Sequence, residues 1–392
     1  RGKLETARTM ISEAKQLLVR DNALASPTHL YCLTDEAVIE RTAGNAMRAA
    51  SLLEQAIDGE RQAGRDKRAD FAELLNTLAR TFYDAGRYRS AVDAARQAAA
   101  LVVRLGLDRT GHMTTALGLE AIALRDGGQP LAALALLQAG GGTDGTVRLS
   151  SRIQYATTLL RLQRLDVLLP LLDGLLTSSR AQDGDSASRA IRLLQVQALV
   201  DANRWQQARE PLADAELMFA TLRKERRYAA RVFAFTRAHW AMAANEAGQA
   251  QNALDEARAI LTTTAQPDDP SWHRVHQLQA RLHLHQGRAA EALTQANEAL
   301  VRSQGQAVEP GASLQVADDL LLRARSRQAL GELEAARADA AAAQRHAEAA
   351  AGVDHPLVAQ ARVTAHARAA SPLPAGGGSL LPVSGAPARP KN

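Results

Sequence analysis

Residues 75–91 read LNTLARTFYDAGRYRSA, and this stretch decides the fold. Apolar side chains recur at helical spacing before Gly86, at Leu75, Leu78 and Phe82, and alanines recur after it. Glycine readily adopts the left-handed backbone that ends a helix, so Gly86 is expected to separate two helices. The stretch therefore predicts a helical hairpin with Gly86 at its turn.

The same arrangement recurs along the chain. We place the turns of successive hairpins at Gly2, Gly44, Gly86, Gly128, Gln163, Asn203, Gly248, Gly287 and Gly331. Alanine stands five residues after nearly every turn and seven residues before it, although it makes up only about a fifth of the chain. Small side chains at these positions let paired helices approach closely. Because a single hairpin cannot bury its apolar face, the hairpins are expected to stack into an α-solenoid.

The composition agrees with an all-α fold. Of the 392 residues, 46% are hydrophobic but only 3% are aromatic, which argues against β-sandwiches and barrels. The single cysteine, Cys32, excludes a disulfide framework and a cysteine-based metal cluster. The net charge of +5 is spread along the chain, so a nucleic-acid partner is not expected. The densest basic stretch, residues 223–231, is predicted to be a solvated helix face.

Residues 75–91 resemble a tetratricopeptide repeat (TPR), of the long 42-residue kind found in kinesin light chains and many bacterial regulatory proteins. The resemblance extends over residues 1–370 and is weakest around residues 153–176, where Gln163 and Leu168 replace the usual glycine and alanine. It implies an all-α, right-handed solenoid with half a repeat, about eight full repeats and a closing helix. Residues 371–392, rich in proline and glycine, are expected to form a disordered tail.

The resemblance also implies a binding surface. In TPR proteins the first helix of each hairpin lines the concave face of the superhelix, through fixed positions before the turn. Those positions select a peptide-binding groove of Tyr31, Arg41, Glu73, Asn76, Arg80, Tyr83, Thr115, Arg125, Asn245, Arg274, Gln277, Arg281, Arg325 and Gln328. Arginines lie near both ends of this set and Leu193, Phe235 and Met242 near its middle, which favours an extended partner with acidic ends and an apolar centre. The alternative is that these residues form ordinary solvated surface.

Two motifs lack the context that their chemistry requires. Residues 140–147 match the glycine-rich loop of protein kinases, but the next lysine is Lys224 and the later kinase motifs are missing. Four histidines cluster in residues 273–285, without a further carboxylate or cysteine at ligand spacing. We therefore expect no catalytic, cofactor or metal site.

The sequence predicts a non-enzymatic scaffold that binds a protein or peptide segment in the groove. The alternative is the C-terminal regulatory or sensor region of a larger bacterial signalling protein, a Ser/Thr protein kinase or a transcription regulator. Two observations favour it: Gly2 would be the turn of a hairpin without its first helix, and arginine outnumbers lysine by 42 to 5. Because no apolar run could span a membrane, we expect a cytoplasmic location, with an extracytoplasmic one open if a membrane segment precedes Arg1.

Overall fold

The computed structural model describes residues 2–21, 23, 26–107, 111–140, 148–182, 185–220 and 227–366. Within these ranges the chain forms eighteen α-helices and no strand. The kinase-like loop 141–147, residues 223–226 of the basic stretch and the tail 371–392 lie outside the described residues.

Sixteen of these helices pair as hairpins, between an opening helix α1 (Gly2–Arg20) and a closing helix α18 (Pro356–His366). The first helices of the hairpins are α2 (Pro27–Thr42), α4 (Ala69–Asp84), α6 (Gly111–Asp126), α8 (Leu149–Arg161), α10 (Asp185–Asp201), α12 (Arg227–Ala243), α14 (Ser271–His285) and α16 (Leu314–Ala329). The second helices are α3 (Ala46–Gln62), α5 (Tyr88–Arg104), α7 (Pro130–Ala139), α9 (Leu165–Gln182), α11 (Arg209–Ala220), α13 (Ala247–Thr264), α15 (Ala289–Gln306) and α17 (Leu333–Ala351).

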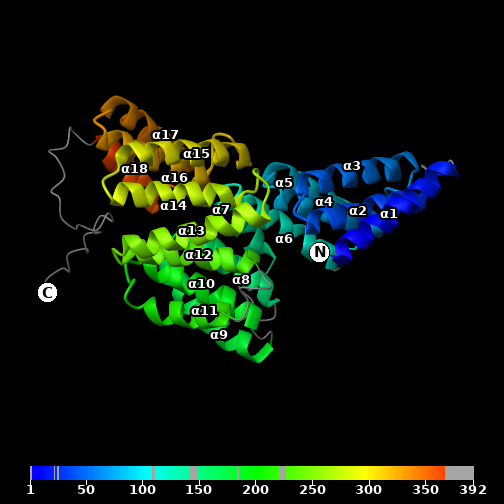
Figure 1. Ribbon diagram of the computed structural model, residues 1–392, viewed down its shortest axis with the longest axis horizontal. Coiled ribbons are helices and arrows are strands. Elements are labelled where there is room, and N and C mark those ends of the chain that lie inside the picture. The colour runs from blue at the N-terminus through cyan, green and yellow to red at the C-terminus, as the bar shows by residue number, and fades with distance from the viewer. Residues whose placement is uncertain are drawn as a thin grey trace.

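The alanine positions lie where the helices cross. Ala79 and Ala91, on the two sides of the Gly86 turn, are both fully buried. The equivalent Leu168 is buried as well and fills the alanine position of a less regular hairpin. Neighbouring hairpins also pack on one another, α3 against α4, α5 against α6 and α15 against α16, so the fold is an all-α solenoid of TPR-like repeats. In Figure 1, α1–α5 project as an arm from a broader body that contains α8–α18.

The turn after α12 corrects one position of the sequence register. The left-handed residue there is Asn245, with a φ of 60°, whereas Gly248 lies inside α13. The amide of Glu246 donates to Ala241 O at 2.8 Å, as the amide of Arg87 donates to Phe82 O beyond the Gly86 turn. With Asn245 as the turn, the distances back to Asn203 and forward to Gly287 are both 42 residues.

This correction predicts opposite effects for two glycine substitutions. Gly248→Ala is expected to stabilise the protein by about 0.5 kcal/mol, because alanine favours a helix and a Cβ there meets open space. Gly287→Ala is expected to destabilise it by about 1 kcal/mol, because Gly287 has a φ of 74°. Urea unfolding measures both changes. If Gly248→Ala loses as much stability as Gly287→Ala, the turn lies at Gly248, as the sequence register placed it.

The superhelix closes on itself along a line of contacts that we call the seam. Two backbone amides, one in the loop between α15 and α16 and one at the first residue of α16, donate to the turn between α6 and α7: Val308 N to Gly127 O at 3.0 Å and Leu314 N to Gly128 O at 2.9 Å. From α5, Arg89 Nε donates to Val308 O at 2.8 Å. A loop in the last third of the chain is thus joined to a turn in the first third.

Contacts on both sides extend the seam. Gln266 Nε2, in the loop before α14, donates to Asn45 Oδ1 at 3.0 Å. At the other end, His355 Nε2 lies 3.2 Å from the backbone oxygen of Arg161, the last residue of α8. The seam therefore joins hairpin turns of the first half to inter-hairpin loops of the second half, and partly encloses the concave face.

Candidate functional site

A groove of about 670 Å³ opens between the first helices of the N-terminal hairpins. Its walls come from the end of α2, one face of α4, the start of α6 and the residue before α8. The groove is lined by Arg41, Ala69, Glu73, Asn76, Thr77, Arg80, Leu107, Gly111, His112, Thr115 and Arg148. The lining thus comes from first helices and from residues that precede them, the elements to which the TPR resemblance assigns the concave face.

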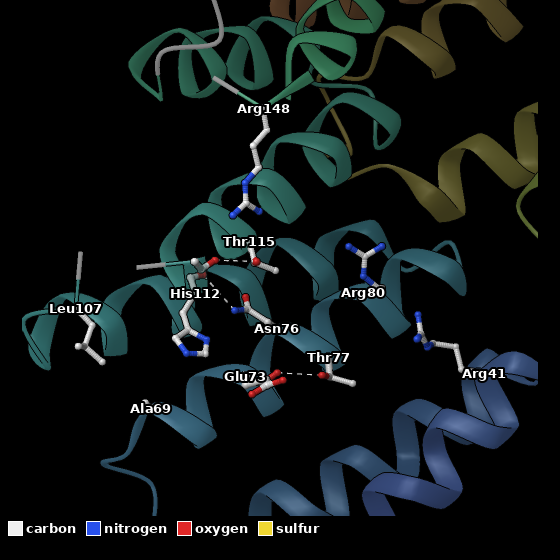
Figure 2. Close-up of a pocket in the computed structure, with 11 residues that line it drawn as sticks. Arg41, Ala69, Glu73, Asn76, Thr77, Arg80, Leu107, His112, Thr115 and Arg148 are labelled. Atoms are coloured by element: carbon white, nitrogen blue, oxygen red, sulfur yellow. Dashed lines mark hydrogen bonds between the residues drawn. The ribbon is translucent and has the colours of Figure 1, made fainter. Parts of the chain in front are cut away.

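Three arginines make the groove cationic. Arg41 Nη1 lies 3.2 Å from Asp84 Oδ2 of the next hairpin, and burial raises the pKa of Asp84 while Arg41 opposes this rise. Within the described residues, Arg80 and Arg148 form no salt bridge. Figure 2 shows Arg148 pointing from the start of α8 into the groove and Arg80 rising from α4. Glu73 is the one acidic side chain in the lining, so the groove carries an excess of positive charge.

Hydrogen-bonding groups lie between these charges. Asn76 is only 5% exposed, and its Nδ2 donates to the backbone oxygen of His112 at 3.2 Å, which ties α4 to α6. Asn76 Oδ1 is buried without a hydrogen-bond partner in the described residues. The hydroxyls of Thr77 and Thr115 donate to their own helices, at Glu73 O and Gly111 O (Figure 2). The polar groups between the arginines are therefore largely engaged within the protein, and the guanidinium groups are the part of the groove that can bind a carboxylate.

Five of the predicted groove residues therefore meet in one place: Arg41, Glu73, Asn76, Arg80 and Thr115. Tyr31 lies on α2 with 61% of its surface exposed, outside the lining.

Tyr83 and Arg125 take part in an internal network instead. Arg125 is only 7% exposed, and its guanidinium donates to both oxygens of Asp126 at 2.8 Å and to Gln154 Oε1 at 2.5 Å. The Tyr83 hydroxyl donates to Asp126 Oδ2 at 2.7 Å, and burial raises the pKa of Tyr83. Arg125 is thus bound within the protein, and its charge is neutralised by Asp126.

The C-terminal predictions fall on the interior of the superhelix. Gln277 is buried and donates to Asp318 and Asp319, and Arg281 pairs with Asp318. Arg274 and Arg325 are half-buried beside them, and Gln328 lies further along α16.

Two predicted features differ from the structure. Asn245 is the exposed turn residue itself and is not on the groove face of α12. The predicted apolar centre packs into the core: Leu193 is 4% exposed, and Phe235 and Met242 are half-buried against the same cluster. These three side chains therefore offer a ligand little free apolar surface.

Sequence reasoning missed residues of two kinds. Thr77, His112 and Arg148 line the groove but stand outside the family positions, and for Arg148 only its place just before a first helix offers a signal. His239 was missed because of the register error. Counted from Asn245, it occupies a groove position of α12, six residues before the turn.

No group of three or more metal-ligating side chains with suitable geometry occurs among the described residues. Within the same ranges, none of the helices has the length and apolar character needed to span a membrane.

No protein-family model matches this sequence, and no curated protein matches it. Among solved structures, the chain is similar to a Rap protein complexed with competence and sporulation factor, with a TM-score of 0.49, 10% sequence identity, and coverage of 86% of this chain and 95% of that chain. It is also similar to the APC/C hetero-tetramer Cut9–Hcn1, with a TM-score of 0.39, 12% identity, and coverage of 87% and 78%. By its own stacked hairpins and buried alanines, the chain is a TPR-like α-solenoid with a cationic groove between its N-terminal first helices.

Proposed function

We propose that this protein is a non-enzymatic scaffold that holds an acidic, extended peptide segment in the groove. The main observation behind this proposal is that Arg80 and Arg148 lie in one open groove, and neither forms a salt bridge with a carboxylate in the described residues. A guanidinium group binds a carboxylate through two parallel hydrogen bonds, so two such groups can fix two acidic side chains of a ligand.

A peptide selection with a matched pair of variants tests this function. Peptides selected on the wild-type protein from a random display library are expected to be rich in Asp and Glu. Their affinity, measured by fluorescence anisotropy, is expected to fall at least about tenfold in Arg80→Ala/Arg148→Ala, since two charge-assisted contacts are lost. Arg87→Ala/Arg104→Ala is the control, because both arginines are exposed and lie outside the groove. Selected peptides without acidic residues, or equal affinity in both variants, would contradict the proposal.

The finer features of the partner are part of the same proposal. A segment with two acidic ends would place one end in this groove and the other near the interior arginines of α14 and α16.

The type of repeat is a separate part of the proposal. The 42-residue spacing of Asn203, Asn245 and Gly287 supports the long type of TPR.

A regulatory role within a larger bacterial signalling protein is the second candidate. The supporting observation is the free face of α1, where Met10 and Leu17, seven residues apart, are 65% and 52% exposed. A further packed helix would cover such a face. The gene sequence upstream of the codon for Arg1 tests this role: a kinase or DNA-binding domain in the same reading frame is expected, and an independent start codon at this point would exclude it.

A further inference from the structure

A second group of arginines gathers across α8, α14 and α16, three of them half-buried and Arg161 exposed, and none of them lines the groove. Arg161 ends α8, Arg274 and Arg281 lie on α14, and Arg325 lies on α16. They are close enough that the charges of Arg161 and Arg281 both lower the pKa of Arg274. The seam brings these helices together, since it holds the α17–α18 turn against the end of α8. We call these four residues the arginine cluster.

Carboxylates also face the arginine cluster. Asp318 accepts hydrogen bonds from Arg281 Nη2 at 2.6 and 2.7 Å. Asp201 accepts one from Gln163 Nε2 at 2.8 Å. A third carboxylate near Arg161, that of Asp126, is already bound through both oxygens by Arg125. A fourth carboxylate, that of the buried Asp319, acts on Arg281 and lies 2.7 Å from His273 Nε2. Apart from the Arg125–Asp126 pair, four guanidinium groups thus face three carboxylates among the described residues, which leaves an excess of one positive charge.

Three of these cations lack a carboxylate at salt-bridge distance in the described ranges. Arg274 donates to the neutral Gln277 Oε1 at 2.6 Å, and Arg325 to the neutral Gln360 Oε1 at 2.9 Å. Arg161 forms no side-chain hydrogen bond there. Burial lowers the pKa of Arg274 to about 10, and burial also lowers the pKa of Arg325. The folded chain alone therefore compensates these charges incompletely, and a bound anion would complete the compensation.

His239 lies beside the same charges. Its Nε2 is 3.5 Å from Asp201 Oδ1, while its Nδ1 is buried without a partner in the described residues. Burial lowers its pKa to about 4, with Arg274 and Arg281 opposing protonation and Asp201 and Asp318 favouring it. His239 is accordingly neutral near pH 7 and can act as a single N–H donor.

We propose that the arginine cluster binds a compact oxyanion with two negative charges, a phosphoryl group or a dicarboxylate. Bidentate guanidinium contacts suit both groups, because their oxygens match the planar fork of arginine. Arg281 and Asp318 retain 37% and 29% of their side-chain exposure, so a small ligand can reach them. The site shares no residue with the groove, so its occupancy by a small anion does not depend on peptide binding there.

Thermal unfolding of the full chain tests the inference. Phosphate and succinate are titrated separately against sodium chloride at equal ionic strength, which separates the phosphoryl from the dicarboxylate ligand. At least one is expected to raise Tm in a saturable way, by about 2 °C or more once its concentration exceeds Kd tenfold. A shift no larger than that of chloride in both titrations would overturn the proposal.

Arg274→Gln locates the effect. Without an added anion this variant is expected to melt at or above the wild-type temperature, because it removes a repelling charge, so it remains folded. Its anion-dependent rise in Tm should disappear or require at least about tenfold more ligand. The control Arg288→Gln changes an exposed arginine before α15 and should respond as the wild type does. A normal response of Arg274→Gln would refute the site.

Two further measurements separate this site from the groove. Arg80→Ala/Arg148→Ala should keep the full anion response, and loss of the response there would mean that the anion binds in the groove. In the wild type, a bound anion should raise the pKa of His239 above its low starting value, since negative charge favours the imidazolium. A nitrogen-detected NMR titration follows that pKa. If the pKa of His239 does not change in saturating anion, the anion does not bind at the arginine cluster.

Discussion

Gly128→Ala is expected to lower the free energy of unfolding by about 3 kcal/mol or more and to open the seam. Gly128 has a φ of 93°, which an alanine adopts only at a cost of about 1 to 2 kcal/mol. An added Cβ would also lie 2.9 Å from the Cα of Ser313 and closer still to its hydroxyl. Because the obstacle includes backbone, the α15–α16 loop must move, and the hydrogen bonds from Val308 and Leu314 are lost with it.

Gly106→Ala is the matched control for this substitution. Gly106 also has a positive φ, 67°, but nothing lies within 4 Å of its added Cβ. It should therefore show the conformational cost alone, about 1 to 2 kcal/mol. Urea unfolding measures the difference, and hydrogen exchange at the amides of Val308 and Leu314 reports the state of the seam. Equal losses in both variants, with unchanged exchange at the two amides, would show that the seam contributes little.

The hairpins could be predicted from the sequence because each one is specified locally. The glycine at position 86 and the alanines at positions 79 and 91 set a turn and two helix contacts within about twenty residues. The predicted turns at Gln163 and Asn203 are confirmed, and both residues are left-handed, with φ values of 55° and 57°.

The register error after α12 has a physical cause. Both candidate turns, Asn245 and Gly248, have alanine five residues after them and seven before, so the alanine pattern did not distinguish them. Glycine is the usual choice at φ > 0, and that preference selected the wrong residue. The error moved the predicted groove positions of α12 by one turn and hid His239.

The charges of the site could not be predicted from the position of each arginine alone. Arg41 and Asp84 are 43 residues apart, as are Tyr83 and Asp126, so each pair joins the end of one first helix to the end of the next. Whether a groove-position arginine is free or neutralised depends on the residue that the end of the next first helix places beside it. The seam joins residues about 180 to 220 apart, and it depends on the curvature summed over many hairpins, for which the sequence holds no local signal.

Arg125→Met is expected to destabilise the protein by about 3 kcal/mol, although Arg125 occupies a groove position of its repeat. The substitution leaves the Asp126 carboxylate, whose side chain is only 15% exposed, with the Tyr83 hydroxyl as its main remaining partner. A buried carboxylate that loses its guanidinium partner is costly, because its desolvation is no longer compensated. By contrast, Arg80→Met should change stability by less than about 0.5 kcal/mol, since Arg80 is exposed.

The dependence of stability on pH separates the structural role of Arg125 from the exposed position of Arg80. Ionisation of Asp126 is expected to stabilise the wild type and to destabilise Arg125→Met. In the wild type, burial opposes ionisation of Asp126, but Arg125 outweighs burial and lowers the pKa. The stabilisation by ionised Asp126 is complete above the pKa of an aspartate in the unfolded chain, about 4. It is lost as the pH falls through the lower pKa of Asp126 in the folded protein. In Arg125→Met, burial is expected to raise that pKa, so stability falls as the pH rises through the raised value. Arg161 also faces Asp126 and limits the rise, while Tyr83 stays neutral throughout this range.

The stability difference between wild type and Arg125→Met should therefore widen as the pH increases from about 4 to 6. Urea unfolding at several pH values measures it, with Arg80→Met as the variant whose difference from wild type stays small and flat. If Arg125→Met behaves like Arg80→Met, then Arg125 is not held by Asp126, and its guanidinium is available to a ligand. If the difference widens as expected, loss of peptide binding in an Arg125 variant reports a damaged scaffold, and binding must be tested at Arg80 and Arg148.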